Sequence, residues 1–322
     1  MKKLLILASM AILLLTGTPK AEANTTAEVP TPFTDISGHW AKKEIEHLYI
    51  GGALGSTEAF RPNDLVTRQE LITMFIQAKH IQPTADKNFS FADVPEGSWL
   101  EPYAETAYRL GLIHGQKSDG QVYFRPDDTI SREELVSILI RARGESGAVN
   151  QFPWSTTVHA LATYSDGDSV QQLYQRPMVY ALQHGLVSAY DDRTLRPQQL
   201  MTRAEAATYA SLHLLADQTG EQTLSDNGTP YRQMMTVKTT AYSYNQNEGL
   251  SYIEFPLHEG IVAVDPNVIP LGTHMYIEGY GYAVAADIGG AVKEKHLDLF
   301  LSSLDQAKAH GIQQDVKVYI LD

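Results

Sequence analysis

The sequence of 322 residues contains no cysteine. This absence excludes a disulfide-stabilised scaffold, a lipoprotein and a catalytic thiol. Beyond the N-terminus, no apolar run approaches the roughly 20 residues that a membrane-spanning helix needs. The sequence also has no HExxH motif, no Cys/His ligand set and no GxSxG motif, so we expect neither a metal, a cofactor nor a serine nucleophile.

Basic residues are scarce as well, since 25 Lys and Arg stand against 38 Asp and Glu, a formal net charge of −13. A strongly acidic protein is repelled by nucleic acid, so we expect no nucleic-acid partner. Anionic cell-wall polymers would be repelled too, unless a few well-placed Arg or Lys side chains bind them locally.

The first stretch of the chain is typical of a secretory signal peptide. Residues 1–23 combine Lys2 and Lys3, an apolar run over residues 4–15 and a small-residue cleavage site, Ala21-Glu22-Ala23. We predict cleavage after Ala23 and a secreted protein with no membrane contact afterwards. An uncleaved anchor is the alternative, which the short apolar run disfavours. The lost segment carries three Lys and one Glu, so the mature charge is −13 − 2 = −15.

A sequence cassette then occurs three times. Each copy opens with an aromatic residue, one variable residue and Asp, continues to an Arg-Pro pair, and ends in a Thr/Ser-Arg-x-Glu box. Its opening aspartates are Asp35, Asp93 and Asp166, and its box arginines are Arg68, Arg132 and Arg203. The order of the segments is fixed, whereas the length of the middle loop varies.

Each box predicts the start of a helix. Thr67, Ser131 and Thr202 are N-caps with Glu three residues later, the pattern of a capping box. An earlier helix is predicted in each repeat, over residues 40–50, 100–110 and 174–184. Helix pairs of this size cannot bury their apolar faces alone, so we expect the three copies to pack on one another.

The box arginines occupy the first helical position, where the helix dipole disfavours a cation. They are therefore candidates for binding an external anion, assisted by the free backbone amides. An inter-repeat salt bridge to the repeat's own Asp explains them at least as well on this evidence.

These residues resemble the S-layer homology (SLH) family, at residues 33–81, 91–144 and 162–215. The family's hallmarks are the Phe-x-Asp opening, a Trp early in the first helix, and a Thr-Arg-Ala-Glu box, complete here at Thr202 to Glu205. The resemblance implies an all-α three-repeat spindle that binds secondary cell-wall polymer, often pyruvylated, through the box arginines. The opening aspartates, Trp40 and Trp99 belong to the same expected polymer-binding set. The third repeat has no equivalent Trp.

Residues 216–230 are polar and without an apolar period, and we predict a linker there. Residues 231–322 contain short β-like runs and one helix over residues 303–310, which predicts a small closed β-barrel. Asp265, Asp287 and Asp298 follow or interrupt these runs, although Asp is depleted in strands and costly to bury unpaired. A shared polar cleft would explain all three.

If the three carboxylates converge, repulsion and partial burial raise the pKa of at least one, and a protonated carboxyl is what glycosidic cleavage needs. Taken singly, Asp265 and Asp287 are better explained as turn residues. Asp298 lies between Leu297 and Leu299, so a turn does not explain it. His296 shares the face of Asp298 and is most simply a solvent-facing residue.

The motifs around these aspartates, Thr240-Ala241-Tyr242, Val262 to Pro266, Ala286 to Gly290 and Leu297 to Phe300, resemble the 3D domain, named for its three Asp residues. The family includes lytic transglycosylase A and stationary-phase survival proteins. It implies an all-β double-psi barrel and non-hydrolytic cleavage of the MurNAc–GlcNAc β-1,4 bond. Asp298 would act as the acid and then the base, while Asp287 and Asp265 would hold its pKa and position the sugar.

Two positions depart from the family pattern. Residues 252–260 replace its usual Thr-Ala-x-Gly segment, and Glu294 stands where Gly usually follows Lys.

The sequence thus predicts a multidomain protein of the Gram-positive cell surface, with an all-α spindle for wall attachment and an all-β barrel that cleaves peptidoglycan glycan strands. The alternative is a non-catalytic surface protein that binds wall glycans through both parts. An S-layer lattice protein is disfavoured by the small size.

Overall fold

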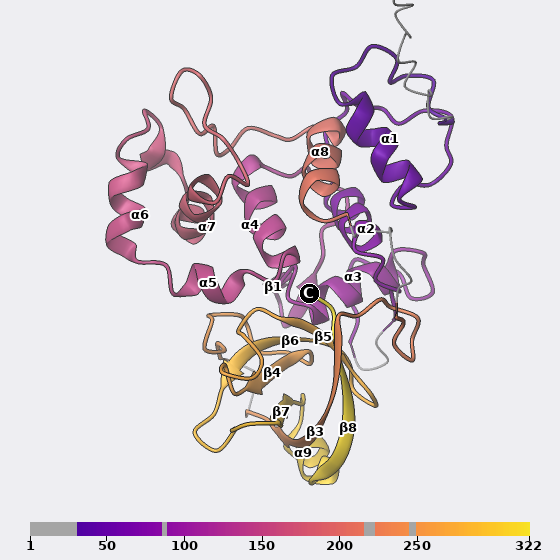
Figure 1. The fold of residues 1–322 in the computed structure, drawn as a ribbon, viewed down its shortest axis with the longest axis vertical. Coiled ribbons are helices and arrows are strands. Elements are labelled where there is room, and N and C mark those ends of the chain that lie inside the picture. The colour runs from indigo at the N-terminus through magenta and orange to yellow at the C-terminus, as the bar shows by residue number, and fades with distance from the viewer. Residues whose placement is uncertain (1–30, 86–88, 216–222, 245–248) are drawn as a thin grey trace, which may run out of the picture. The chain divides into compact units, whose positions relative to one another are not determined.

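The structure is a computed structural model that describes residues 31–85, 89–215, 223–244 and 249–322 (Figure 1). The predicted signal peptide, residues 1–23, lies outside these ranges. Residues 31–322 form one compact unit. Within the described ranges, no helix combines the length and the apolar character needed to span a bilayer.

Helices dominate the three N-terminal repeats, and the predicted helix starts are confirmed. Each box opens the second helix of its repeat: α2 (Arg68–Ala78), α4 (Arg132–Ala142) and α8 (Arg203–His213). Thr67 and Thr202 close complete capping boxes, and Ser131 accepts from the backbone N–H of Glu134. The remaining helices are α1 (Lys42–Ile50), α3 (Glu101–Arg109), α5 (Ser146–Asn150), α6 (Trp154–Leu161), α7 (Gln172–Gln183) and the 3₁₀ turn η1 (Gly167–Ser169).

The apolar faces of the second helices meet in one core. Leu71 and Phe75 of α2, Leu135 and Leu139 of α4, and Ala207 of α8 are fully buried members of one cluster. Packing of the three copies on one another, which no single helix pair could replace, buries these faces.

The expectation of an all-α N-terminal region is wrong. Strands β1 (Gln116–Ser118) and β2 (Gln121–Tyr123) form an antiparallel hairpin in the second repeat. Asp119 and Gly120 between them both have positive φ, as a two-residue type I′ turn requires, and Asp-Gly is its usual sequence. Isolated β-bridges also join the segments before the second helices, Leu65 with Thr202, Thr67 with Thr129 and Ser131 with Leu200.

The C-terminal part is a closed barrel with strand order β3-β7-β4-β6-β5-β8 (Figure 1). Its interior is apolar, and Leu297 and Leu299 of β7 are each 1% exposed. The strands are β3 (Gln233–Tyr242), β4 (Ile261–Val264), β5 (His274–Ile277), β6 (Gly281–Ile288), β7 (His296–Phe300) and β8 (Gln313–Ile320).

The predicted helix near residue 303 is present as α9 (Leu304–His310), capped by the Ser303 side chain. The barrel part is therefore not all-β. The fold class expected from the sequence, an all-α spindle beside an all-β double-psi barrel, is wrong, since both parts mix helix and strand.

The barrel packs directly on the repeats through α3. The Arg109 side chain is 6% exposed and donates to the carbonyl oxygens of Tyr280 (2.7 Å) and Tyr282 (3.0 Å), beside β6. Glu259, 7% exposed, lies 3.7 Å from the same guanidinium. Gly147 of α5 leaves no space for a Cβ because the backbone of Leu271 passes against it.

The described part of the predicted linker is an ordered turn. Leu224 pairs with Pro230, and Thr229 is 1% exposed. The hydroxyl of Thr229 lies 2.5 Å from that of Tyr282 and accepts from the backbone N–H of Gln82 (3.0 Å). This turn therefore connects the first repeat to the barrel by hydrogen bonds.

Candidate functional site

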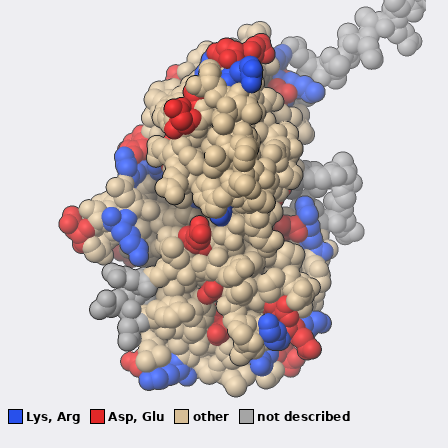
Figure 2. Space-filling view, turned by 90° about the vertical axis from the view of Figure 1, so that its left-hand side faces the viewer, with Lys and Arg blue, Asp and Glu red and all other residues tan. Residues whose placement is uncertain are grey.

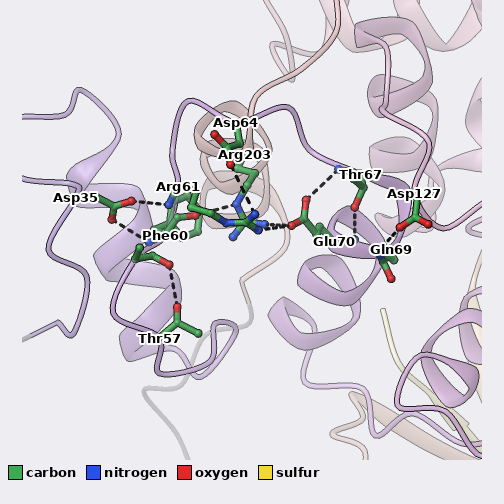
Figure 3. Close-up of polar contacts among 11 residues, drawn as sticks. Asp35, Thr57, Phe60, Arg61, Asp64, Thr67, Gln69, Glu70, Asp127 and Arg203 are labelled. Atoms are coloured by element: carbon green, nitrogen blue, oxygen red, sulfur yellow. Dashed lines mark hydrogen bonds and ion pairs between the residues drawn. The ribbon is translucent and has the colours of Figure 1, made fainter.

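The three opening aspartates act within their own repeats. Each carboxylate accepts two backbone N–H groups of the Arg-Pro segment, at 2.6–2.8 Å for Asp35 (Figure 3), 2.7–2.8 Å for Asp93 and 2.7–2.8 Å for Asp166. The second donor in each case is an arginine in the left-handed region: Arg61 (φ 59°), Arg125 (φ 61°) and Arg196 (φ 49°). That conformation costs an L-residue about 1–2 kcal/mol, so the paired hydrogen bonds hold a strained turn.

Two of the three box arginines are neutralised by a box glutamate of another repeat. Arg203 pairs with Glu70 (Nη1–Oε1 2.7 Å) and donates through Nε to the carbonyl oxygen of Phe60 (2.8 Å), as Figure 3 shows. Arg68 forms the equivalent pair with Glu134. An inter-repeat ion pair, one of the two explanations left open by the sequence, is therefore present, but its acceptor is Glu rather than Asp.

Arg132 breaks this pattern. It donates to the Tyr209 hydroxyl (3.1 Å) and the Ser188 carbonyl oxygen (2.8 Å), and its guanidinium carbon lies 5.1 Å from the centroid of the Tyr190 ring. Glu205, in the equivalent position to Glu70 and Glu134, accepts from Thr202 instead. Within the described ranges, Arg132 has no carboxylate in ion-pair distance, and its Nε has no partner.

Arg132 lines a pocket of about 470 Å³ between the loop after α7 and helix α8. Trp40 of the first repeat, 63% exposed, lines the same pocket, as do Tyr190 and Tyr209. Trp99 is as exposed, at 62%, but lies against Tyr103. The structure thus brings together Arg132 and Trp40, which the sequence selected, and adds two tyrosines that no motif had marked.

Charged side chains of both signs are interspersed on the face drawn in Figure 2, and broad areas of it carry no charge. This face therefore carries no continuous basic field.

In the barrel, Asp287 and Asp298 lie on one face. Ala263 of β4 pairs with Asp298 of β7 on one side and with Asp287 of β6 on the other. Residues paired across strands share a face, and two strand spacings of about 4.8 Å place the two Cα atoms roughly 10 Å apart. Ala263, which lies between them, has a small side chain.

A β-bulge sets the position of Asp287. The β4–β6 register shifts after Val262, which pairs with Ala285, so that Ala286 is skipped and Asp287 pairs with Ala263. Ala286 is 0% exposed, and its carbonyl oxygen accepts from the backbone N–H of Ile253 (3.2 Å). Such a bulge re-aims the following side chain, here toward the face of Asp298.

Each of these two carboxylates has a hydroxyl partner on β3. Thr240 donates to Oδ1 of Asp298 (2.6 Å), and Tyr242 donates to Oδ2 of Asp287 (2.9 Å). Backbone N–H groups of Tyr252 and Ile288 donate to the other oxygen of Asp287, at 3.0 Å each. Burial, and then the neighbouring Asp287, raise the pKa of Tyr242, so this phenol stays a donor. The Thr-Ala-Tyr motif marked both residues, but not their roles.

Asp265 is held differently, at the end of β4. It is 8% exposed and accepts from the backbone N–H of Glu294 (2.9 Å) and from the backbone and side chain of Asn267 (3.1 and 3.0 Å). These hydrogen bonds, first that from Glu294, lower the pKa of Asp265. This carboxylate therefore stays ionised, the opposite of what a proton donor requires. Within the described ranges, no group of three His, Asp or Glu side chains could hold a metal.

Glu294 itself has φ 56°, a conformation that Gly adopts without strain. This geometry explains why the expected residue at that position is Gly.

Two family descriptions match the chain. The S-layer homology domain matches residues 32–72, 90–136 and 163–207, and the 3D domain matches residues 260–322. The resemblances inferred from the sequence are thereby confirmed.

Curated relatives cover parts of the chain. The exoglucanase XynX of Acetivibrio thermocellus is 31% identical over 198 residues, 61% of this chain and 17% of that protein. The cell wall-binding protein YocH of Bacillus subtilis is 42% identical over 94 residues, 27% of this chain and 32% of that protein. The S-layer protein sap of Bacillus anthracis is 27% identical over 180 residues, 55% of this chain and 20% of that protein. The chain thus spans about a third or less of each relative.

Solved structures match only in part. Escherichia coli MltA with bound chitohexaose is 23% identical with a TM-score of 0.20, covering 23% of this chain and 27% of that chain. A Streptomyces papain inhibitor is 20% identical with a TM-score of 0.23, covering 29% of this chain and 98% of that chain.

The matched domains and the cell-surface relatives indicate a cell-wall-associated protein of the cell surface. The chain thus carries three S-layer homology domains followed by a C-terminal 3D domain.

Proposed function

We propose that this protein is a wall-anchored peptidoglycan-cleaving enzyme, whose repeats bind secondary cell-wall polymer and whose barrel acts as a lytic transglycosylase. The observation that carries the proposal is the pairing of Asp298 and Asp287 with Ala263 on one face of the barrel. Two carboxylates held by separate donors, with a small residue between them, suit a sugar that must be protonated on one side and stabilised on the other.

In the proposed reaction, the protonated carboxyl of Asp298 donates to the glycosidic oxygen as the bond from C1 of MurNAc to that oxygen breaks. The sugar's own 6-hydroxyl then bonds to C1 and gives its proton to Asp298, which leaves a 1,6-anhydro end. Asp287, fixed by Tyr242 and two backbone N–H groups, stabilises the positive charge at C1. Asp265 supports this site from the end of β4 by fixing the loop before β7.

For attachment, we assign the leading role to the Arg132 pocket. An anionic substituent such as a ketal carboxylate would accept from a guanidinium that has no carboxylate partner, while Trp40 offers an exposed ring to the sugar. Arg68 and Arg203 would have to break an ion pair first, so their grooves bind more weakly. The aspartates Asp35, Asp93 and Asp166 support the loops of these grooves rather than contact polymer.

Purified protein added to Gram-positive sacculi tests the enzyme. The wild type should release anhydro-muropeptides and Asp298→Asn should release none, while the exposed control Asp305→Asn retains activity. Binding of the wild type without any anhydro product would leave the alternative, a non-catalytic wall-binding protein, an activity that the name of the YocH relative also describes.

Co-sedimentation with sacculi tests the anchor independently. Arg132→Gln should weaken binding about tenfold or more, because a hydrogen bond to a charged group contributes roughly 1.5–3 kcal/mol. Arg232→Gln, an exposed arginine of the barrel, is the charge-matched control. Equal binding of the two variants, or undiminished binding to sacculi stripped of wall polymer, would contradict the assignment.

A further inference from the structure

The Thr240 hydroxyl lies between a carboxylate and an imidazole. It is 2.6 Å from Oδ1 of Asp298 and 2.9 Å from Nε2 of His296, and the three side chains lie on one face of neighbouring strands β3 and β7. All three residues are half-buried. The other imidazole nitrogen, Nδ1, is 3.3 Å from the carbonyl oxygen of Ala291.

These contacts restrict where the protons can be. A carbonyl oxygen only accepts, so Nδ1 carries a proton. If Thr240 donates to Asp298, its oxygen accepts from Nε2, and His296 is a cation facing a carboxylate. If Asp298 is protonated and donates to Thr240, then Thr240 donates to Nε2, and His296 is neutral. Both arrangements satisfy every contact with the same number of protons.

We propose that His296 and Thr240 form a proton relay that supplies the acid proton to Asp298 before cleavage, an inference that rests on the proposed transglycosylase reaction. In one transfer, the N–H bond at Nε2 breaks as that proton moves to Thr240 Oγ1, and the Thr240 proton moves to Oδ1 of Asp298. The imidazolium becomes neutral and the carboxylate becomes a carboxylic acid, so charge and protons balance without another reactant. The reverse transfer follows when Asp298 receives the proton of the 6-hydroxyl.

Other charged groups face this relay. Lys238 of β3 pairs directly with His296 and opposes its positive charge, whereas Asp298 favours it. Asp287 lies beyond Ala263, with Tyr242 as its donor. Lys293, Glu294 and Lys295 lie in the segment just before β7, and all three are exposed. Asp298 is the group that reaches His296 through a single hydroxyl.

The chain contains its own control. Thr239 and His310 make the same kind of contact, Oγ1 to Nε2 at 3.0 Å, next to Thr240 in sequence. No carboxylate contacts that hydroxyl in the described part of the chain. His310→Gln therefore tests the loss of a histidine–threonine contact without a relay.

The experiment compares Thr240→Val, Thr240→Ser, His296→Gln and His310→Gln in anhydro-muropeptide release against pH. Thr240→Val should lower kcat about 100-fold, the lower end of what a general acid–base group contributes, and Thr240→Ser should restore it. His296→Gln should move the fall of activity at high pH to lower pH, because Asp298 alone must then keep the proton. His310→Gln should leave kcat and the profile unchanged. A Thr240→Val enzyme with wild-type kcat and profile would overturn the relay.

A second measurement needs no activity. Imidazole ¹⁵N shifts, assigned through the signal lost in His296→Gln, report the protonation of both nitrogens. The Nε2 shift of His296 should change in Asp298→Asn and in Thr240→Val, since each removes the carboxylate or the contact to it. If sacculi yield no product but the His296 signal still responds to both substitutions, the proposed function fails, whereas the coupling of His296 to Asp298 through Thr240 is supported. If product forms but the Nε2 shift of His296 is unchanged in both variants, the relay fails alone.

Discussion

Replacing Arg109 by methionine should destabilise the whole compact unit, because this residue joins α3 to the barrel. The change leaves Glu259 buried without its cation and removes the donors to the carbonyl oxygens of Tyr280 and Tyr282. Removing one partner of a buried ion pair typically costs about 3–5 kcal/mol. We expect Arg109→Met to lower the free energy of unfolding by that amount.

The converse change should be milder. Glu259→Gln leaves Arg109 with both carbonyl acceptors and retains an acceptor for the backbone N–H of Ser302, so we expect a loss of about 1–2 kcal/mol. The double variant should lose less free energy of unfolding than the two single variants together, since neither buried charge is then left without its partner. We expect a coupling energy of about 1–3 kcal/mol between the two substitutions.

Urea unfolding with two probes measures these effects. Trp40 and Trp99 belong to the first two repeats, and Trp154 begins α6 between the second and third repeats. Tryptophan fluorescence therefore reports the N-terminal helical part, while circular dichroism reports both parts. The transitions should coincide in the wild type and separate in Arg109→Met. A loss below about 1 kcal/mol in Arg109→Met, or wild-type transitions that are already separate, would refute the reasoning, since a buried ion pair that holds two parts together cannot be that dispensable.

Three further outcomes follow from local geometry. Glu294→Gly should stabilise the protein by about 1 kcal/mol in urea unfolding, because it relieves a left-handed conformation, and a loss of stability would contradict this. Asp93→Ala should cost about 1–3 kcal/mol by leaving the N–H groups of Phe124 and Arg125 without an acceptor, measured in the same way. Asp265 has a lowered pKa, so its contribution is complete above its unfolded pKa of about 3.9 and is lost as pH falls through the lower folded value. The stability difference between the wild type and Asp265→Asn should therefore be larger at pH 7 than at pH 3, and a difference independent of pH would exclude this role.

Local patterns were sufficient for the helix starts. Thr67 and Glu70 lie within one turn, so their mutual hydrogen bonds depend on nothing beyond four residues. The Asp119-Gly120 turn carries an equally local signal, which the interpretation of the repeats as purely helical had passed over.

The ion pairs of the box arginines could not be predicted in the same way. Arg203 and Arg132 occupy identical positions in their boxes, yet only Arg203 meets a glutamate of another repeat. Arg132 donates instead to Tyr209 and to the Ser188 carbonyl oxygen, partners 77 and 56 residues away in the sequence, which no local pattern indicates.

The barrel site shows the same limit. Alternation along β7 was enough to separate Asp298 from Leu297 and Leu299. Alternation could not predict on which face Asp287 lies, because the bulge at Ala286 interrupts it. The bulge is recognised only from the pairing of β6 with β4.

Leu271 packs directly on Gly147, and Arg109 donates to the carbonyl oxygen of Tyr282 across the same boundary. These contacts restrict movement of the barrel relative to the repeats. An enzyme on a flexible linker can reach an area of the wall around its attachment point, and the length of the linker sets the radius of that area. Under the proposed function, this radius would shrink to the breadth of the molecule, so each wall-bound copy would cleave only the glycan strands directly beside it. The spacing of attachment sites along the wall, rather than the turnover of any one copy, would then determine how evenly the glycan strands are cleaved.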